Sequence, residues 1–286
     1  MKLTVFTPTY NRRELLAKAY ESLCMQTDRS FVWLIVDDGS DDDTESLVKE
    51  WIREHKIEIR YDYCKNGGKM RAHNRGVALC DTEWFLCLDS DDILVPTAVE
   101  QILACESYLK DEKVAGIVAH KGRSETETLY DAAFPASGYS TLYGLYLKGF
   151  RGETTLVFKT EILRAYPFPE IAGEKYVPED YIYDKIDENH VLYILPEILT
   201  VCELVSEGYT DRLKQIRDEN PRAWFLYYEQ RARITPVSFR KWKYLGYYIR
   251  YAKRCHEPLM KNGAISPVFV LTAYPAAWFL KWTGRA

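Results

Sequence analysis

A run of five apolar residues, 84–88, leads directly into the acidic segment Asp89-Ser90-Asp91-Asp92. A continuous apolar run of this length predicts a strand covered on both faces, as in the parallel sheet of an α/β protein. Open α/β sheets bind their ligands at the carboxyl ends of such strands. Carboxylates this close repel one another unless a cation lies between them, and oxygen-only ligands suit Mg²⁺ or Mn²⁺. The alternative is an acidic cap on the helix that follows.

Residues 1–120 alternate strand-like and helix-like segments, which predicts a parallel sheet with right-handed crossovers. The expected strands are residues 3–6, 31–36, 57–61, 84–88 and 114–119, and the expected helices are 11–26, 40–54, 70–79 and 97–109. Asn11 is the expected cap of the first helix, and Ser40 with Asp43 resembles a capping box for the second. Further on, we expect strands at 154–158, 191–195 and 199–204 and a helix at 178–186.

The charge of the chain changes towards its C-terminal part. Residues 1–210 contain 23 Lys or Arg and 37 Asp or Glu, which gives them a net charge of −14. Residues 211–286 contain 15 Lys or Arg and 5 Asp or Glu, which gives a net charge of +10. The two parts therefore face different partners, and we expect a helical, basic and aromatic extension over residues 206–286.

The cysteines and the first residues predict a cytoplasmic protein. Seven cysteines without a CxxC pair indicate packed free thiols in a reducing compartment. The chain passes directly into a predicted strand and lacks the basic start and apolar stretch of a signal peptide. Since no stretch holds 18 clean apolar residues, we expect no membrane-spanning helix.

The sequence contains no glycine-rich phosphate loop, because neither GxxxxGKS/T nor GxGxxG occurs. A nucleotide bound by this domain would need a metal ion and side chains to hold its phosphates. The acidic segment at residues 89–92 offers the oxygen ligands for such an ion, which favours the metal site over the helix cap.

Four short motifs follow the predicted strands in order. They are residues 7–11 (TPTYN), residues 36–40 (VDDGS), the pattern Asn66-x-Gly68-x-x-x-Ala72-x-Asn74-x-Gly76, and residues 88–92 (LDSDD). In this order and at this spacing, they resemble the motifs of the family 2 glycosyltransferases over about residues 1–205. His73 departs from the pattern, because many relatives carry arginine at that position.

This resemblance implies a GT-A fold, which is a Rossmann-like, mostly parallel sheet flanked by helices. Residues 1–120 would form the half that binds the nucleotide sugar, and residues 121–205 the acceptor half. The implied activity is an inverting, metal-dependent hexosyl transfer with Mn²⁺ or Mg²⁺. The donor would be a nucleotide sugar, with a UDP-sugar as the first choice. The acceptor would be a glycan or a lipid-linked glycan of the cell envelope or capsule.

The resemblance also implies roles for the strand-end residues. It places the donor base against Pro8, Thr9, Tyr10 and Asn11. Asp38 would accept a hydrogen bond from the base ring, Lys69 would lie near the diphosphate, and Asp89 with Ser90 would contact the donor. Asp91 and Asp92 would bind the metal ion. The alternatives are a helix cap for Asp38 and a solvated lysine for Lys69.

A second pair of carboxylates, Glu179 and Asp180, resembles the acceptor-side motif of the same family. Pro178 suits the first turn of a helix, where the helix dipole favours an ionised carboxylate. An ionised carboxylate can take the proton from an acceptor hydroxyl as it attacks the anomeric carbon. We expect Asp180 to be this base, with Glu179 orienting it or substituting for it. The alternative is a pair of acidic residues that cap the helix.

The basic C-terminal extension predicts peripheral contact with the cytoplasmic face of the membrane. Residues 267–280 form an apolar run that is too short to span a bilayer but suits the interface, where Trp, Tyr and Lys gather. The alternative is a helical subdomain that packs on the catalytic domain or on another subunit, so the oligomeric state stays open. No recognition motif supports nucleic-acid binding.

Two other functions compete with glycosyl transfer. A sugar nucleotidyltransferase would carry a glycine-rich, basic loop after its first strand, and residues 7–13 lack one. A GT-A domain that has lost its activity could serve as a membrane-associated scaffold. The presence of Asp91, Asp92 and Asp180 argues against that loss.

Overall fold

The computed structural model describes residues 1–130, 134, 137–202, 213–259 and 265–282. The chain divides into two compact units, which are described separately. Unit 1 consists of Met1–Phe168 and Ile182–Val205, and unit 2 consists of Pro169–Tyr181 and Ser206–Ala286. The contacts of Pro169–Tyr181 therefore group it with the C-terminal helices, while the boundary at residue 205 stays a prediction.

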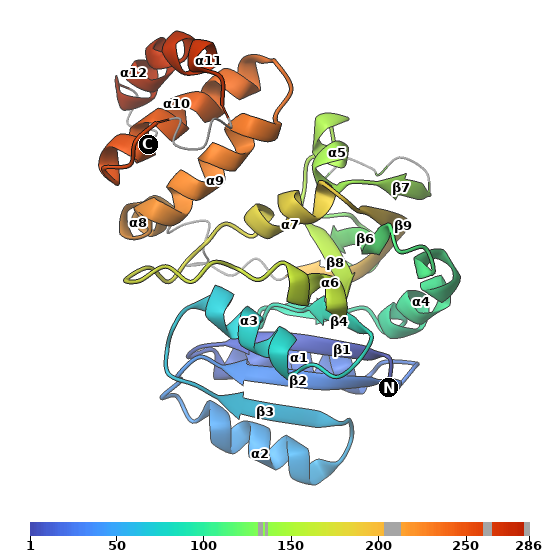
Figure 1. Ribbon diagram of the computed structural model, residues 1–286. Coiled ribbons are helices and arrows are strands. Elements are labelled where there is room, and N and C mark those ends of the chain that lie inside the picture. Colours follow the sequence, from blue (N-terminus) through green and yellow to red (C-terminus); the bar gives the residue numbers. More distant parts are fainter. Residues whose placement is uncertain (131–133, 135–136, 203–212, 260–264, 283–286) are drawn as a thin grey trace. The chain divides into compact units, whose positions relative to one another are not determined.

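Unit 1 is built on a nine-stranded sheet in the order β3-β2-β1-β4-β8-β6-β9-β5, with β7 paired to β9 (Figure 1). The strands are β1 Leu3–Thr9, β2 Phe31–Asp37, β3 Ile59–Tyr63, β4 Trp84–Cys87, β5 Asp92–Leu94, β6 Val114–Gly122, β7 Gly138–Ser140, β8 Thr154–Lys159 and β9 Val191–Cys202. The helices are α1 Arg13–Cys24, α2 Thr44–Glu54, α3 Lys69–Leu79, α4 Ala98–Ala104, the 3₁₀ turn η1 Cys105–Leu109, α5 Leu142–Leu147, α6 Thr160–Ala165 and α7 Asp180–Asp187. Helix α7 begins in unit 2 and continues in unit 1.

The strands β3, β2, β1 and β4 are parallel, as predicted. Alternate residues of β1 face opposite layers, as expected of a buried strand. Val5 belongs to a core that includes Leu16 of α1 and Val48 of α2. Phe6 points to the other face, where a Cβ atom on Gly76 of α3 would lie 2.4 Å from its ring. Helices therefore cover both faces of this half of the sheet.

The remaining strands make the sheet mixed, because β8 runs antiparallel to both β4 and β6. The two strands expected at 191–195 and 199–204 are one strand, β9, in its described part, and residues 203–204 lie outside the described residues. The pairing of β9 with β6 shifts register between Ile194 and Ile198. Pro196 lies in this irregular stretch, where its missing N–H removes no ladder bond.

The predicted helix caps are wrong. Arg12 and Asp43 occupy the N-cap positions of α1 and α2, and neither side chain caps its helix. Asn11 instead adopts a left-handed φ of 51°, which asparagine tolerates better than most residues. Its backbone N–H donates to Ser40 Oγ at 2.9 Å, and its Oδ1 accepts the N–H of Asp41 at 2.9 Å. These side chains connect the loops after β1 and β2 instead of capping helices.

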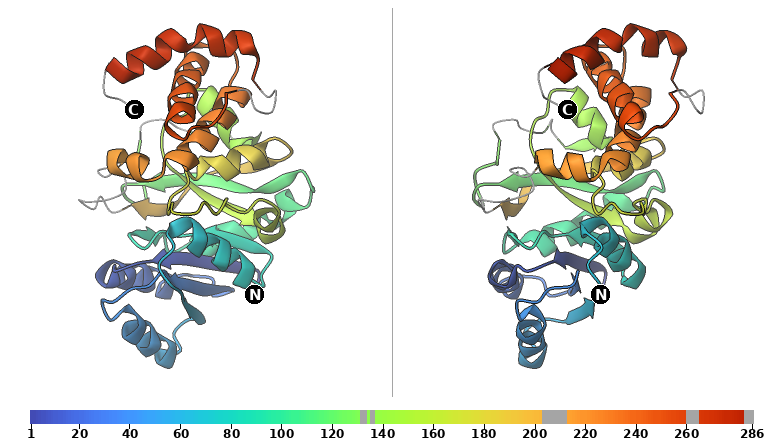
Figure 2. Two further views of the ribbon diagram at one scale, coloured as in Figure 1. Left: turned by 60° about the vertical axis from the view of Figure 1, so that its left-hand side comes forward. Right: turned by 90° about the vertical axis from the view of Figure 1, so that its left-hand side faces the viewer.

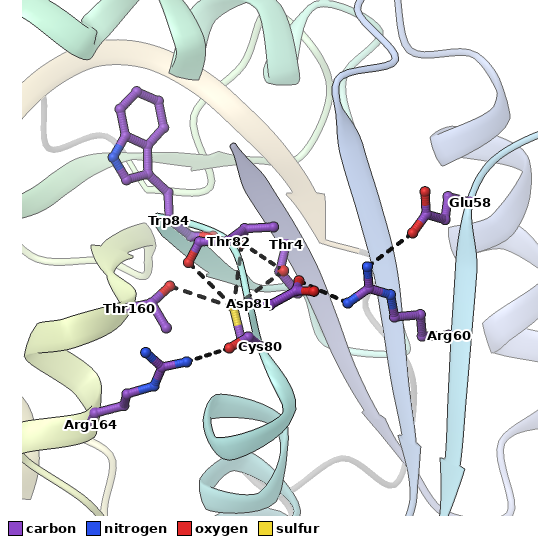
Figure 3. Close-up of polar contacts among 9 residues, drawn as sticks. All are labelled: Thr4, Glu58, Arg60, Cys80, Asp81, Thr82, Trp84, Thr160 and Arg164. Atoms are coloured by element: carbon purple, nitrogen blue, oxygen red, sulfur yellow. Dashed lines mark hydrogen bonds and ion pairs between the residues drawn. The ribbon is translucent and has the colours of Figure 1, made fainter. Parts of the chain in front are cut away.

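A buried polar cluster connects the end of α3 to the start of β4 (Figure 3). The Cys80 thiol lies 3.3 Å from the hydroxyls of Thr4 and Thr82 and 3.5 Å from that of Thr160. The Arg164 guanidinium donates to the Cys80 carbonyl. The amino end of β4 is therefore tied to β1, α3 and α6, which fixes the strand that carries the acidic segment.

Unit 2 contains the helices α8 Leu213–Glu219, α9 Pro221–Ile234, α10 Phe239–Arg254, α11 Pro267–Thr272 and α12 Tyr274–Trp282. Helix α10 packs against both α9 and α12, and Figure 2 shows α11 and α12, at the red end of the colour bar, lying across α10. Gly246 permits this approach, since a Cβ atom there would lie 3.1 Å from the backbone of α12. Among the described residues, no helix has both the length and the apolar character needed to cross a bilayer.

Candidate active site

The carboxyl ends of β1, β2 and β4 gather the predicted donor-binding residues at one edge of unit 1. Parallel pairing sets Thr9 beside Asp37, and the N–H of Asp38 donates to the Thr9 carbonyl at 2.9 Å. Arg12 Nη1, just after β1, lies 2.9 Å from Asp91 Oδ2 and 3.5 Å from Ser90 Oγ. Residues 8–12, Asp38 and the acidic segment therefore lie together, as the motif order predicts.

Each carboxylate of the acidic segment has its own cationic partner. The three ion pairs are Lys69–Asp89 at 2.6 Å, Arg12–Asp91 at 2.9 Å and Lys121–Asp92 at 2.7 Å. The like charges of the three carboxylates are therefore separated by protein cations. Of these cations, only Lys69 was predicted to belong to the site.

The pKa values of Asp89 and Asp92 are shifted in opposite directions. Burial would raise the pKa of Asp89, but the charges of Lys69 and Lys121 outweigh it and hold that pKa at about 2. Burial dominates at Asp92 and raises its pKa above the ordinary value, although Lys121 opposes the shift. The pKa of Lys121 is raised, because Asp92 and Asp89 outweigh the effect of its own burial. Asp89 is therefore ionised at neutral pH.

The acidic segment fits a hard divalent cation in its donor chemistry. The side chains of Asp89 and Asp91 are 32% and 23% exposed, whereas that of Asp92 is 7% exposed. Over the residues that the structure describes, no three His, Cys, Asp or Glu side chains form a group that could hold a metal. Mg²⁺ is commonly held by only one or two carboxylates together with substrate phosphates. Asp91 and Asp89 meet that requirement better than Asp92, whose role as a metal ligand stays a prediction.

Asp38 holds the loop that leads into α3. Its carboxylate accepts the backbone N–H of Gly67 at 2.7 Å and of Gly68 at 2.8 Å, and the side-chain amide of Asn66 at 3.1 Å. Gly68 has a φ of 95°, which favours glycine, and it directly precedes Lys69. The sequence did not indicate this loop-anchoring role, and the predicted contact between Asp38 and a base stays a prediction.

The end of β1 combines one accessible aromatic ring with one buried, unpaired hydroxyl. Tyr10 is 49% exposed, so its ring is accessible. Thr9 is buried, and its hydroxyl has no hydrogen-bond partner. Buried hydroxyl groups are normally paired, so the Thr9 hydroxyl is an orphan at the predicted donor site.

In unit 2, the segment that leads to the predicted base is tied to the start of α9. The Glu174 carboxylate accepts the backbone N–H groups of Arg222 and Ala223, each at 2.8 Å. These are among the amide groups that a helix leaves unpaired at its N-terminus, where a negative charge is also favourable. Asn220 Oδ1 accepts the N–H groups of residues 175 and 176 at 2.8 and 3.0 Å.

The same helix holds Asp180, the first residue of α7. Arg231 Nη2 lies 2.8 Å from Asp180 Oδ2, and Tyr227 donates a further hydrogen bond to this carboxylate. Gln230 Nε2 donates to the Tyr181 carbonyl at 2.8 Å. Contacts from the start of α9 and from its later turns therefore support residues 174–176 and 180–181.

The electrostatics of Asp180 differ from the prediction. Loss of hydration raises the pKa of Asp180, whereas Arg231 lowers it and Glu179 raises it. The expected effect of the helix dipole is therefore outweighed by the surrounding protein. The Asp180 side chain is 43% exposed, so a ligand can reach the carboxylate.

A cavity of about 240 Å³ lies at this carboxylate pair. It is lined by Tyr176, Pro178, Glu179, Asp180, Trp224 and Tyr227. All six residues belong to unit 2. The predicted base therefore faces a cavity whose other walls are largely aromatic.

Residues 4–164, more than half of the chain, match the family model described as "Glycosyl transferase family 2". The chain belongs to this family. It is 35% identical over 113 residues to a chondroitin synthase from Escherichia coli, which covers 40% of this chain and 16% of that protein. It is 34% identical over 99 residues to a teichoic acid poly(glycerol phosphate) polymerase from Staphylococcus epidermidis, covering 34% of this chain and 14% of that protein. The chain thus matches only a small part of these longer relatives.

Two solved structures share the fold. TarS from S. aureus, solved as residues 1–349 in complex with UDP-GlcNAc, matches with a TM-score of 0.64 and 17% identity over 96% of this chain and 79% of that one. The mannosyltransferase PcManGT from Pyrobaculum calidifontis, in complex with GDP-Man and Mn²⁺, matches with a TM-score of 0.53 and 18% identity over 98% of this chain and 75% of that one. These likenesses confirm the predicted GT-A fold class.

Proposed function

We propose that this protein is an inverting glycosyltransferase that moves a sugar from a nucleotide-sugar donor to a hydroxyl of a glycan or lipid-linked glycan. The observation that carries the proposal is the edge of unit 1 where the ends of β1, β2 and β4 bring residues 8–11, Asp38 and the acidic segment together. Membership of glycosyl transferase family 2 supports the same activity and disfavours a sugar nucleotidyltransferase.

The donor base is proposed to lie against residues 8–11. The accessible ring of Tyr10 can stack on a base. TarS binds UDP and UDP-GlcNAc in its solved complexes, and PcManGT binds GDP-Man. Since both neighbours take nucleotide sugars but differ in the base, we keep the UDP-sugar as our proposal for this chain.

Asp91 and Asp89 are proposed to hold Mn²⁺ or Mg²⁺ together with the donor diphosphate. A bound divalent cation would neutralise charge on the departing diphosphate. Lys69 is 16% exposed and held by Asp89, which keeps a positive charge at the place proposed for the diphosphate. Mn²⁺ accompanies the donor in the PcManGT complex, which supports a divalent ion here without identifying it.

Asp180 is proposed to act as the general base. An acceptor hydroxyl would give its proton to the Asp180 carboxylate as its oxygen forms a bond to the anomeric carbon. The bond from that carbon to the diphosphate breaks, and the nucleoside diphosphate leaves with the bonding electrons. Attack on the face opposite the leaving group inverts the configuration. The raised pKa of Asp180 suits this task, because a base works best when its pKa approaches the operating pH.

A finer part of the proposal is that α11 and α12 touch an anionic membrane surface. Residues 270, 273, 277 and 280 are buried within unit 2, so one side of these helices packs against the other C-terminal helices. Their other side exposes Val268, Leu271, Trp278, Phe279 and Trp282, each between 51% and 74%. Exposed Trp and Phe on a chain segment with a charge of +10 favour a lipid surface of negative charge.

The deciding experiment combines donor binding with Asp180→Asn. Thermal shifts with UDP-, GDP- and TDP-sugars, each with and without Mn²⁺, should identify a stabilising donor. Asp180→Asn should then keep this shift and lose transfer of the sugar. A protein that binds the donor but never turns it over would be the inactive scaffold. A protein that no nucleotide sugar stabilises would refute the proposed function.

A further inference from the structure

We infer that the cavity at Asp180 is an acceptor subsite for a single uncharged sugar ring, and that α9 builds it. The inference rests on the proposed function, because it names the class of molecule that meets the proposed base. It gives the C-terminal unit a part in substrate recognition, apart from any contact with membranes.

The aromatic walls suit the apolar faces of a sugar ring. Tyr176 and Tyr227 line the cavity and are each partly exposed, so their rings can contact a ligand. Trp224 packs against both, with its ring centre 6.0 Å from that of Tyr176 at 25° and 5.6 Å from that of Tyr227 at 89°. Large, rigid aromatic side chains that combine an apolar body with a polar tip suit sugars, whose C–H groups and hydroxyls alternate.

The Nε1–H of Trp224 is an unpaired hydrogen-bond donor. Trp224 is 5% exposed, lines the cavity, and its Nε1 has no hydrogen-bond partner. The Arg217 guanidinium already lies 4.8 Å from the centre of its ring, so protein groups contact the indole while its N–H stays unpaired. A buried donor of this kind normally finds a partner. Since the Nε1 atom itself is buried in the free protein, a sugar hydroxyl or ring oxygen would supply this partner once the cavity wall moves to admit it.

The carboxylates decide which ligand class fits. Glu179 and Asp180 also line the cavity, and carboxylates accept hydrogen bonds from hydroxyl groups. The described side chains that line the cavity include no Lys, Arg or His to pair with a phosphate or an acidic sugar, so an uncharged ring is expected. The volume of about 240 Å³ is below the range of about 300–1,000 Å³ typical of drug-sized ligands. One ring, rather than a long oligosaccharide, matches that size.

The walls are held in place by a helix instead of a free loop. Glu174 and Asn220 fix residues 174–176 at the start of α9, and Arg231 fixes Asp180 further along the same helix. Trp224 and Tyr227 project from the intervening turn. Sites carried by rigid elements hold their geometry more closely than sites on loops. The aromatic groups and the proposed base are therefore positioned by one element.

The test measures sugar binding and nucleotide binding separately on the full chain. The probes are methyl glycosides of glucose, galactose and N-acetylglucosamine at millimolar concentration, observed by saturation-transfer NMR, and UDP observed by calorimetry. Trp224→Phe removes the N–H but keeps a ring, and should weaken glycoside binding about threefold to tenfold, the value of one hydrogen bond. Tyr176→Ala should weaken it more than about tenfold, and Tyr176→Phe should retain it. Tyr139→Ala, an exposed tyrosine of β7 in unit 1, is the matched control.

The outcomes separate this inference from the proposed function. If UDP binds but no glycoside does, or if Trp224→Phe and Tyr176→Ala bind glycosides as the unaltered protein does, the acceptor subsite is refuted and the donor site is not. If neither UDP nor any nucleotide sugar binds while the glycosides still do, the proposed transfer fails and the sugar site stands. Retained UDP binding and unchanged circular dichroism in each variant exclude unfolding as the cause of lost glycoside binding.

Discussion

The guanidinium of Arg231 lies 2.8 Å from the carboxylate of Asp180, although 51 residues separate them in the chain. Arg231 is buried, because its side chain is only 5% exposed. A cation from the solvent cannot easily take its place beside Asp180. Arg231 opposes the burial that raises the pKa of Asp180. Arg231 therefore affects the charge state of the proposed base, although it lies outside the family match, which ends at residue 164.

Arg231→Gln should move the acid limb of the transfer rate to higher pH. Removing the cation leaves burial and Glu179 to raise the pKa of Asp180, with Tyr227 alone opposing them. Transfer needs the ionised base, so the rate rises with pH through this pKa and the variant reaches its plateau later. A shift of one unit would cost about tenfold in rate below the plateau. The measurement is the pH profile of kcat. Arg231→Lys keeps the charge and should shift the limb less, and an unmoved limb in Arg231→Gln would assign the base elsewhere.

Asp91→Asn should mainly affect metal-dependent donor binding, whereas Asp92→Asn should mainly affect the stability of the fold. Asp91→Asn should raise the Mn²⁺ concentration needed for donor binding, because it removes an accessible carboxylate ligand. Asp92→Asn removes the nearer carboxylate of the Lys121 ammonium, which keeps Glu153 at 3.8 Å, and should cost about 1.5–3 kcal/mol of unfolding free energy, with a smaller effect on the Mn²⁺ requirement. Calorimetric titration of UDP at several Mn²⁺ concentrations and urea unfolding measure the two effects. The reverse pattern would identify Asp92 as the metal ligand.

Asp38→Asn should weaken the loop over residues 66–68. The two Asp38 carboxylate oxygens accept the backbone N–H groups of Gly67 and Gly68. In the asparagine variant, one of these oxygens becomes an N–H₂ group, which would place a donor against a donor. Loss of one charge-assisted bond costs about 1.5–3 kcal/mol of unfolding free energy. UDP affinity should fall as well, since Lys69 follows the loop directly. Asp41→Asn changes an exposed carboxylate nearby and is the control. Equal stability of the two variants would contradict the anchoring role of Asp38.

His73 should lower the free energy of unfolding when the pH falls below the pKa that this histidine has in the unfolded chain. Burial, assisted by the charge of Lys69, lowers the pKa of His73 to about 3, so the imidazole is neutral at pH 7. Since the folded pKa is below the unfolded value of about 6.5, protonation favours the unfolded state as the pH falls from 6.5 towards 3. The cost is at most about 1.4 kcal/mol for each pH unit. His73→Leu should therefore lose less stability than the unaltered protein between pH 7 and pH 5 in urea unfolding. Equal losses would show that another group dominates.

Trp278→Ser combined with Trp282→Ser should release the protein from anionic vesicles. These side chains are 68% and 74% exposed, and each can contribute about 1.5–3 kcal/mol when buried in an apolar environment. Sedimentation with vesicles of phosphatidylcholine alone and with added phosphatidylserine measures the effect. Leu147→Ser removes an exposed apolar side chain from unit 1 and is the control. Vesicle binding that persists in the double variant would argue against this face.

The predictable parts of the site are those that depend on residues close together in the sequence. Apolar runs that end in polar motifs fixed the strands and their order, so residues 8–11, Asp38 and the acidic segment were expected together. The cations were harder, because Lys121 and Arg231 approach their carboxylates from strands and helices that are distant in sequence. Local polar patterns also gave wrong predictions. Asn11 and Ser40 resemble helix caps, but they connect the loop after β1 to the loop after β2. A single sequence does not show which partner a polar side chain selects.

The attachment of Glu174 and Asn220 to α9 has a practical consequence for protein engineering. A chimera made by joining residues 1–205 of this chain to the C-terminal part of a relative would keep Asp180 but replace the helix that holds it. The natural exchange unit is instead Pro169–Tyr181 together with the C-terminal helices. Acceptor preference should travel with that discontinuous module, and donor preference should stay with the remainder of the chain.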